Sequence, residues 1–136
     1  MTNLSLAHWG WAVTSIEDAL SAFIALGFTQ SSSVTEDLLR KVRILLLSDA
    51  AGNVIELVEP LCPESPVSKL LDKMGATPYH ACFSIEKTEW DAQKKTLQKA
   101  GFLEIINASP APALGGNEVI FLYSKHIGLV EIVLIN

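Results

Sequence analysis

The chain has 136 residues, of which 49% are hydrophobic and 18% are charged, and its formal net charge is -5. A chain with few charges and much apolar surface can offset the entropy lost on folding by burial, which excludes intrinsic disorder. Ten Lys and Arg against fifteen Asp and Glu argue against a nucleic-acid partner, which requires a basic face. The length predicts a single domain.

The first part of the chain contains no Lys or Arg before Arg40, so it lacks the positive residues that begin a secretory signal. The charge-free stretch 19–35 contains several hydroxyl and amide side chains and is too polar to span a bilayer. Cys62 and Cys82 have neither a metal-motif spacing nor a disulfide framework. We therefore expect a cytoplasmic protein without a membrane partner.

Two segments of the chain have similar residue patterns. One starts at His8 and the other at His80, and each continues through a helix pattern to a glycine, 19 and 21 residues later. Strand-like runs then lead to Glu56, 29 residues beyond the first glycine, and to Glu131, 30 residues beyond the second. Each half therefore predicts a β-α-β-β-β order, with a His on the first strand and a Glu on the last.

Helix starts are indicated by hydroxyl and acidic residues after the first strand of each half. Thr14 with Glu17 predicts a capping box, and Thr88 with Asp91 predicts a weaker one. Between the halves, a Ser-Pro start and a Gly stop predict a packed linker helix over about residues 65–75.

The two histidines are expected to share one face of their strands with small residues. Side chains two apart on a strand lie on the same face, so His8 shares its face with Gly10, and His80 shares its face with Cys82. The bulkier opposite face should pack under the helix, which leaves the histidine face open to a cavity. In the first half this bulky face carries Trp9, Trp11 and Val13.

Two His and two Glu at repeat-related positions suggest a metal site. An ionised Glu flanked by apolar residues in a central strand is costly unless it is paired or bound to a metal. Imidazole and carboxylate suit a divalent ion of Zn, Ni, Co, Fe or Mn, which the pattern does not distinguish. The predicted ligands are His8, Glu56, His80 and Glu131, and the alternative is a cup-shaped binding protein that kept these residues without the ion.

The residues 55–61, 65–67, 79–83 and 128–131 resemble the vicinal oxygen chelate superfamily, which includes glyoxalase I, bleomycin-resistance proteins and extradiol dioxygenases. Within it, the chain is most similar to the branch of methylmalonyl-CoA epimerase and glyoxalase I. The resemblance implies an α+β fold of two βαβββ modules, at about 4–60 and 77–135, which form a curved mixed sheet around a cavity.

The same resemblance implies the chemistry. Matched by position, His8, Glu56, His80 and Glu131 are the four metal ligands, and a glutamate, Glu131 or Glu56, moves the proton. The implied activity is that of a metal-dependent lyase or isomerase, which stabilises an enediolate formed next to a carbonyl. The implied partners are a small carbonyl or thioester substrate and a second copy of the chain.

Two other functions fit the pattern. One is a non-catalytic binding protein of the bleomycin-resistance type. The other is an extradiol-type oxygenase, in which His8, His80 and Glu131 hold iron, although Glu56 then occupies a position that such enzymes leave open. The third histidine, His126, is expected in a solvated turn.

Overall fold

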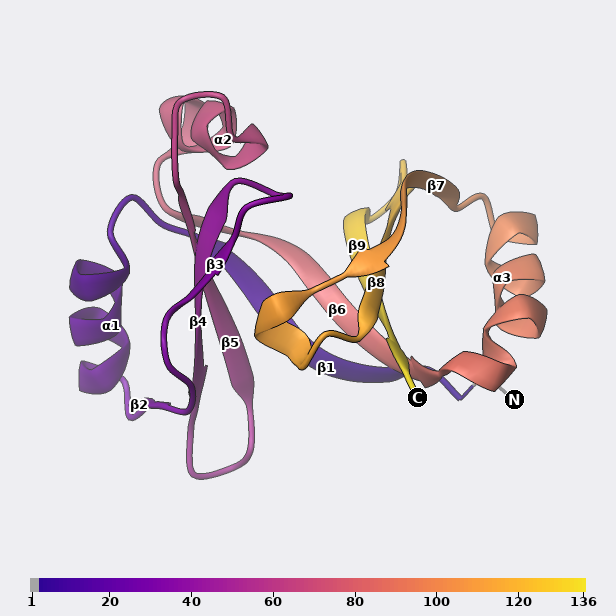
Figure 1. Cartoon of the computed structure of the whole chain (residues 1–136), viewed down its shortest axis with the longest axis horizontal. Helices are drawn as coiled ribbons and strands as arrows, with labels where there is room; N and C mark the ends of the chain where they lie inside the picture. The colour runs from indigo at the N-terminus through magenta and orange to yellow at the C-terminus, as the bar shows by residue number, and fades with distance from the viewer. Residues whose placement is uncertain (1–2) are drawn as a thin grey trace. The chain divides into compact units, whose positions relative to one another are not determined.

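The computed structural model describes residues 3–136, which form two compact units. The first unit is His8–Tyr79, and the second combines residues 3–7 with residues 80–136. Each boundary falls inside a strand, the first within β1 (Ser5–Ala12) and the second within β6 (Thr77–Glu86) (Figure 1). None of the helices in residues 3–136 is long and apolar enough to cross a membrane.

The first unit is a mixed sheet with one helix on its face and one at its end. The strand β1 pairs in parallel with β5 (Val54–Pro60), which pairs antiparallel with β4 (Val42–Ser48). The strand β4 in turn pairs antiparallel with the short strands β2 (Thr29–Gln30) and β3 (Thr35–Asp37). The helices of this unit are α1 (Ile16–Ala25) and α2 (Pro66–Met74).

The core of the first unit lies between α1 and the sheet. Phe23 is buried on α1, and its ring meets the edges of Trp11 and Phe28, with centroids 5.2 and 5.4 Å away. Ile16 and Leu57 complete this apolar cluster together with two leucines of β4. Such edge-to-face aromatic pairs add to the stabilisation that burial gives.

The second unit repeats this plan with one helix. The strand β6 pairs in parallel with β9 (Gly128–Ile135), which pairs antiparallel with β8 (Glu118–Ser124). The strand β8 pairs antiparallel with the irregular strand β7 (Leu103–Pro110). In Figure 1, α3 (Trp90–Lys99) stands beside these strands. The 3-10 turn η1 (Lys87–Glu89) precedes α3, and the 3-10 turn η2 (Pro112–Leu114) lies between β7 and β8.

The sheet of the second unit is apolar on both faces. On the helix side, Trp90 is buried against Ile120 and Ile132. On the other side, Cys82 and Phe121 form a second cluster with Ala111, Val119 and Val133, and Ala7 packs against it. A strand with apolar residues buried on both of its faces has a nearly continuous hydrophobic sequence, as residues 129–135 have except at Glu131.

Several sequence predictions are confirmed. The second half has the predicted β-α-β-β-β order, and the first half has one short strand more, because both β2 and β3 precede β4. The four predicted residues lie on the first and last strand of each half, with His8 on β1, Glu56 on β5, His80 on β6 and Glu131 on β9. The linker helix is α2, where the Ser65 hydroxyl accepts a hydrogen bond from the Val67 amide and Pro66 occupies the first turn. These local signals were reliable because each depends on only a few neighbouring residues.

Both predicted capping boxes are wrong. The cap of α1 is Ser15 rather than Thr14, and its hydroxyl accepts from the Asp18 amide at 3.2 Å. Glu17 lies in the first helical turn, where its carboxylate accepts from Arg43. The helix α3 starts at Trp90 without a side-chain cap, because the chain enters it through η1, whose backbone bonds already satisfy the first amides.

The expectation that all bulky residues of the first strand pack under the helix is wrong at Trp9, which is 48% exposed. Trp11 and Val13 do pack in the core below α1. The reason is the position of the helix, since Phe23 of α1 meets Trp11, near the carboxyl end of β1.

Candidate metal centre

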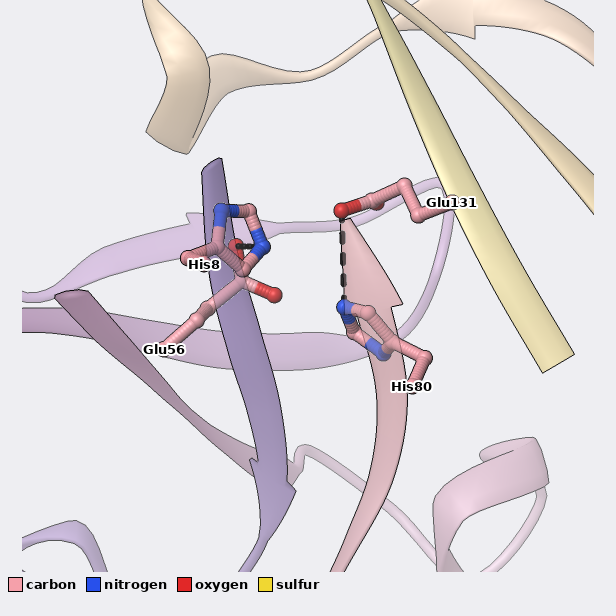
Figure 2. Close-up of side chains that lie close together, drawn as sticks. All are labelled: His8, Glu56, His80 and Glu131. Carbon is pink, nitrogen blue, oxygen red and sulfur yellow. Dashed lines mark ion pairs between the residues drawn. The ribbon is translucent and has the colours of Figure 1, made fainter. Parts of the chain in front are cut away.

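The first unit brings His8 and Glu56 together through strand register. In the parallel pair of β1 and β5, Gly10 lies opposite Glu56, and His8 precedes Gly10 by two residues on the same face. The imidazole Nε2 of His8 lies 3.4 Å from Oε2 of Glu56, and both side chains are 4% exposed. Figure 2 shows the pair joined across the two strands.

The second unit repeats this geometry with other residues. In the parallel pair of β6 and β9, Cys82 lies opposite Glu131, and His80 again precedes the opposing residue by two. The imidazole Nε2 of His80 lies 3.4 Å from Oε1 of Glu131, with the side chains 1% and 6% exposed (Figure 2). The same offset in both units means that the repeat preserves the register and not only the residue types.

Burial of these pairs has a chemical consequence. A carboxylate taken out of water needs a positive partner, which a protonated imidazole or a metal ion supplies. Each of the four residues offers a donor atom, an imidazole nitrogen or a carboxylate oxygen, of the kind that Zn, Ni, Co, Fe and Mn accept. The donor chemistry of each pair therefore fits a divalent metal ion.

In each unit, the strand paired with the glutamate strand on its other side places a different residue opposite the glutamate. In the first unit Leu46 of β4 lies opposite Glu56, and in the second Phe121 of β8 lies opposite Glu131. The Phe121 ring stands perpendicular to the His80 imidazole, with centroids 5.7 Å apart and an interplanar angle of 90°. The sequence alternation did not identify Phe121, because finding it requires the pairing register of β8 with β9.

The loop between β7 and β8 packs on the same face as the second pair. Ala111 is buried, and Leu114 of η2 packs against the cluster that contains Cys82 and Phe121. The sequence left this loop either as a cavity edge or as a rigid connection, and the structure shows it covering the apolar face. His126 is exposed in the turn after β8, as expected, and its amide donates to the Ser124 hydroxyl.

The basic residues at the start of β4 are paired with carboxylates. Arg40 donates to Asp37 at 2.7 Å, and Arg43 donates to Glu59 at 2.7 Å. The hydrogen bond that the Arg43 guanidinium donates to Glu59 raises the pKa of Arg43 above its ordinary value. Glu59 also accepts from the Ile16 amide at 2.9 Å, so this acid joins two strands to the start of α1.

Each unit thus brings together one His and one Glu of the four that the sequence singled out. The convergence of both pairs on a single ion stays a prediction. In residues 3–136, neither Cys62 nor Cys82 forms a disulfide.

Known proteins with similar sequences and folds agree with this architecture. The Glyoxalase/Bleomycin resistance protein/Dioxygenase superfamily matches residues 7–121. The uncharacterized protein YqjC of Bacillus subtilis (strain 168) is 31% identical over 133 residues, which cover 93% of this chain and 89% of that protein.

Two solved structures show the same fold. A hypothetical protein from Bacillus halodurans C-125 has a TM-score of 0.82 at 29% identity, over 99% of this chain and 96% of that one. Methylmalonyl-CoA epimerase from Mycobacterium tuberculosis has a TM-score of 0.82 at 24% identity, over 96% of this chain and 87% of that one. These likenesses confirm the predicted α+β, glyoxalase-like fold.

Proposed function

Because the chain belongs to the glyoxalase/bleomycin resistance protein/dioxygenase superfamily, we propose that it is a divalent-metal-dependent lyase or isomerase. The reaction is the removal of a proton next to the carbonyl of a small carbonyl compound or thioester. The repeated strand register carries the proposal, since each unit holds a buried His and Glu 3.4 Å apart on adjacent parallel strands. The superfamily includes enzymes, among them the methylmalonyl-CoA epimerase.

In this proposal His8, Glu56, His80 and Glu131 would hold one ion together. The donor set supports it, because two imidazoles and two carboxylates would leave coordination positions on the ion for substrate or water.

The chemistry of the proposal divides between the ion and the chain. When bound, the ion supplies a Lewis acid that stabilises negative charge on a substrate oxygen. The two imidazoles orient the site, and a carboxylate within reach of the adjacent carbon accepts its proton. Glu131 and Glu56 are the proposed bases. Two carboxylates that act from opposite sides suit racemisation, whereas one that removes and returns the proton suits isomerisation.

Metal titration tests the proposal directly. Protein freed of metal with a chelator is titrated by calorimetry with Ni²⁺, Co²⁺, Zn²⁺, Mn²⁺ and, without oxygen, Fe²⁺. We expect one ion per chain, and a loss of affinity of about 100-fold or more in H8A, E56Q, H80A and E131Q, since even groups that only orient a ligand are worth 10–100-fold. The matched control is H126A, which removes the exposed third histidine and should bind as the unchanged chain does.

The pattern across these variants separates the alternatives. Loss in only H80A and E131Q, or in only H8A and E56Q, would show that one unit alone binds the ion and would refute the four-ligand site. A chain that binds none of the five ions, and that a planar apolar ligand stabilises against heat, would be a binding protein of the bleomycin-resistance type.

Catalysis needs its own measurement. The metal-loaded protein is incubated in D₂O with an α-branched acyl-CoA thioester or with the hemithioacetal of a 2-oxoaldehyde, and exchange of the proton next to the carbonyl is followed by NMR. We expect exchange with one of these classes, and none in the chelator-treated protein. Ring cleavage of a catechol by the iron-loaded protein would instead identify an oxygenase.

We also propose that the protein is a cytoplasmic homodimer. Its two cysteines do not form a disulfide in the described structure, which suits a reducing compartment. Light scattering of the purified chain gives the mass of the assembly, and a monomer at micromolar concentration would contradict the dimer.

A further inference from the structure

We propose that Phe121 is a positioning residue that holds the His80 imidazole in its metal-binding orientation. The inference rests on the proposed metal site and deepens it, because it assigns a role to a side chain that donates no ligand atom. Its basis is the perpendicular contact between the two rings, with centroids 5.7 Å apart.

The strands determine this contact. Phe121 lies opposite Glu131 in the antiparallel pair of β8 and β9, and directly opposed residues project their side chains to the same face. His80 lies on the strand at the other side of β9, with its Nε2 3.4 Å from Glu131. The Glu131 carboxylate on β9 and the Phe121 ring on β8 therefore both lie next to the His80 imidazole.

The contact restricts rotation of the imidazole. A histidine side chain has a broad, roughly two-fold preference about its last torsion, so packing must decide which ring nitrogen faces the carboxylate. The Phe121 and His80 side chains are both buried, and an edge-to-face ring contact has a preferred angle that a turned imidazole loses. Phe121 thereby limits the orientations open to the His80 imidazole before an ion binds, so that less conformational entropy is lost on binding.

The first unit shows that the fold does not require an aromatic ring at this position. The residue opposite Glu56, at the register position of Phe121, is Leu46, which has no ring. The aliphatic side chain fills space but has no preferred ring angle. The second unit therefore has a ring contact to its imidazole at the register position where the first unit has an aliphatic side chain.

The test uses the same substitution at two places in the same unit. F121L gives the second unit the residue type that the first unit has, and F83L is its matched control, because Phe83 lies on the helix side of β6 and packs in the other cluster. We expect F121L to bind Co²⁺ about 10-fold more weakly and to change the visible absorption spectrum of the bound Co²⁺. We expect F83L to lower the melting temperature and to leave both the affinity and the spectrum unchanged.

The outcomes distinguish this inference from the proposed function. If the unchanged chain binds Co²⁺ and F121L binds it equally well with the same spectrum, the positioning role is wrong and the metal site stands.

If the unchanged chain binds no ion, the proposed function fails first, and ¹⁵N NMR of His80 in the metal-free protein still tests the contact. One nitrogen should carry the proton in the unchanged chain, and the two forms should mix in F121L; equal spectra would overturn the inference. Should F121L not fold, F121M replaces the ring by a flexible unbranched side chain and is expected to behave as described for F121L.

Discussion

The two units place their His and Glu by the same rule but build the surrounding structure differently. In both, the histidine stands two residues before the strand neighbour of the glutamate, and the two side chains lie 3.4 Å apart. In the first unit, Ser15 and Glu59 hold the start of the helix. In the second, the helix starts after a 3-10 turn with no side-chain cap. The shared feature is thus the register of the first and last strands.

This difference teaches which part of a repeat is constrained. A shift of one residue in register would turn the histidine or the glutamate to the other face of the sheet, so the pair tolerates no slippage. A helix start, in contrast, needs only some partner for its free amides, and several partners serve equally well. The strand neighbours of the pairs also differ, with Gly10 and Leu46 beside Glu56 and Cys82 and Phe121 beside Glu131.

The largest expected effect separates the two glutamates as proton acceptors. With either residue as a base, E56Q or E131Q is expected to slow proton exchange about 100-fold or more, the usual contribution of a positioned base. Measured at saturating metal, the two rates show whether both units supply a base. The control is E118Q, which removes a carboxylate paired with Lys87 near the surface. Wild-type exchange in both variants would exclude both glutamates as bases.

The next effect concerns the aromatic cluster in the core of the first unit. Phe23 is buried and meets two other rings, so F23A is expected to lower the free energy of unfolding by about 3–5 kcal/mol. Urea denaturation measures this change. The control is I24A on the same helix, where the side chain is 55% exposed and the expected loss is under about 1 kcal/mol. Equal losses in the two variants would show that the ring cluster does not stabilise the unit.

The sequence predicted what depends on short-range patterns and on the internal repeat. The spacing predicted the strand that carries each histidine and glutamate, the linker helix after Ser65, and the pairing of one histidine with one glutamate in each half. What it did not predict depends on contacts between distant residues. Ser15 and Thr14 are equally good caps by composition, and the choice depends on where the chain leaves β1. Phe121 was missed because the pairing register between β8 and β9 cannot be deduced from the sequence of either strand alone.

A smaller effect tests the anchor of the first helix. Glu59 accepts from the Ile16 amide at 2.9 Å and from Arg43 at 2.7 Å, with its side chain 13% exposed. In E59Q one charged pair is lost while the shape is kept, and we expect the free energy of unfolding to fall by about 1–2 kcal/mol. The loss should shrink in high salt, because the ion pair is partly screened there. Its counterpart at the second unit's surface, E118Q, should cost less than about 0.5 kcal/mol. If E59Q were as mild as E118Q, Glu59 would not anchor the helix.

The smallest effect compares the helix starts themselves. Ser15 is the only one of three candidate hydroxyl caps, Thr14, Ser15 and Thr88, whose side chain accepts from a first-turn amide of its helix in the described residues. S15A is therefore expected to lower the free energy of unfolding by about 1 kcal/mol, whereas T14A and T88A should each change it by less than about 0.5 kcal/mol. Chemical denaturation of the three variants measures these changes side by side. A loss in T88A as large as that in S15A would mean that α3 does use a threonine cap, and that the two units begin their helices in the same way after all.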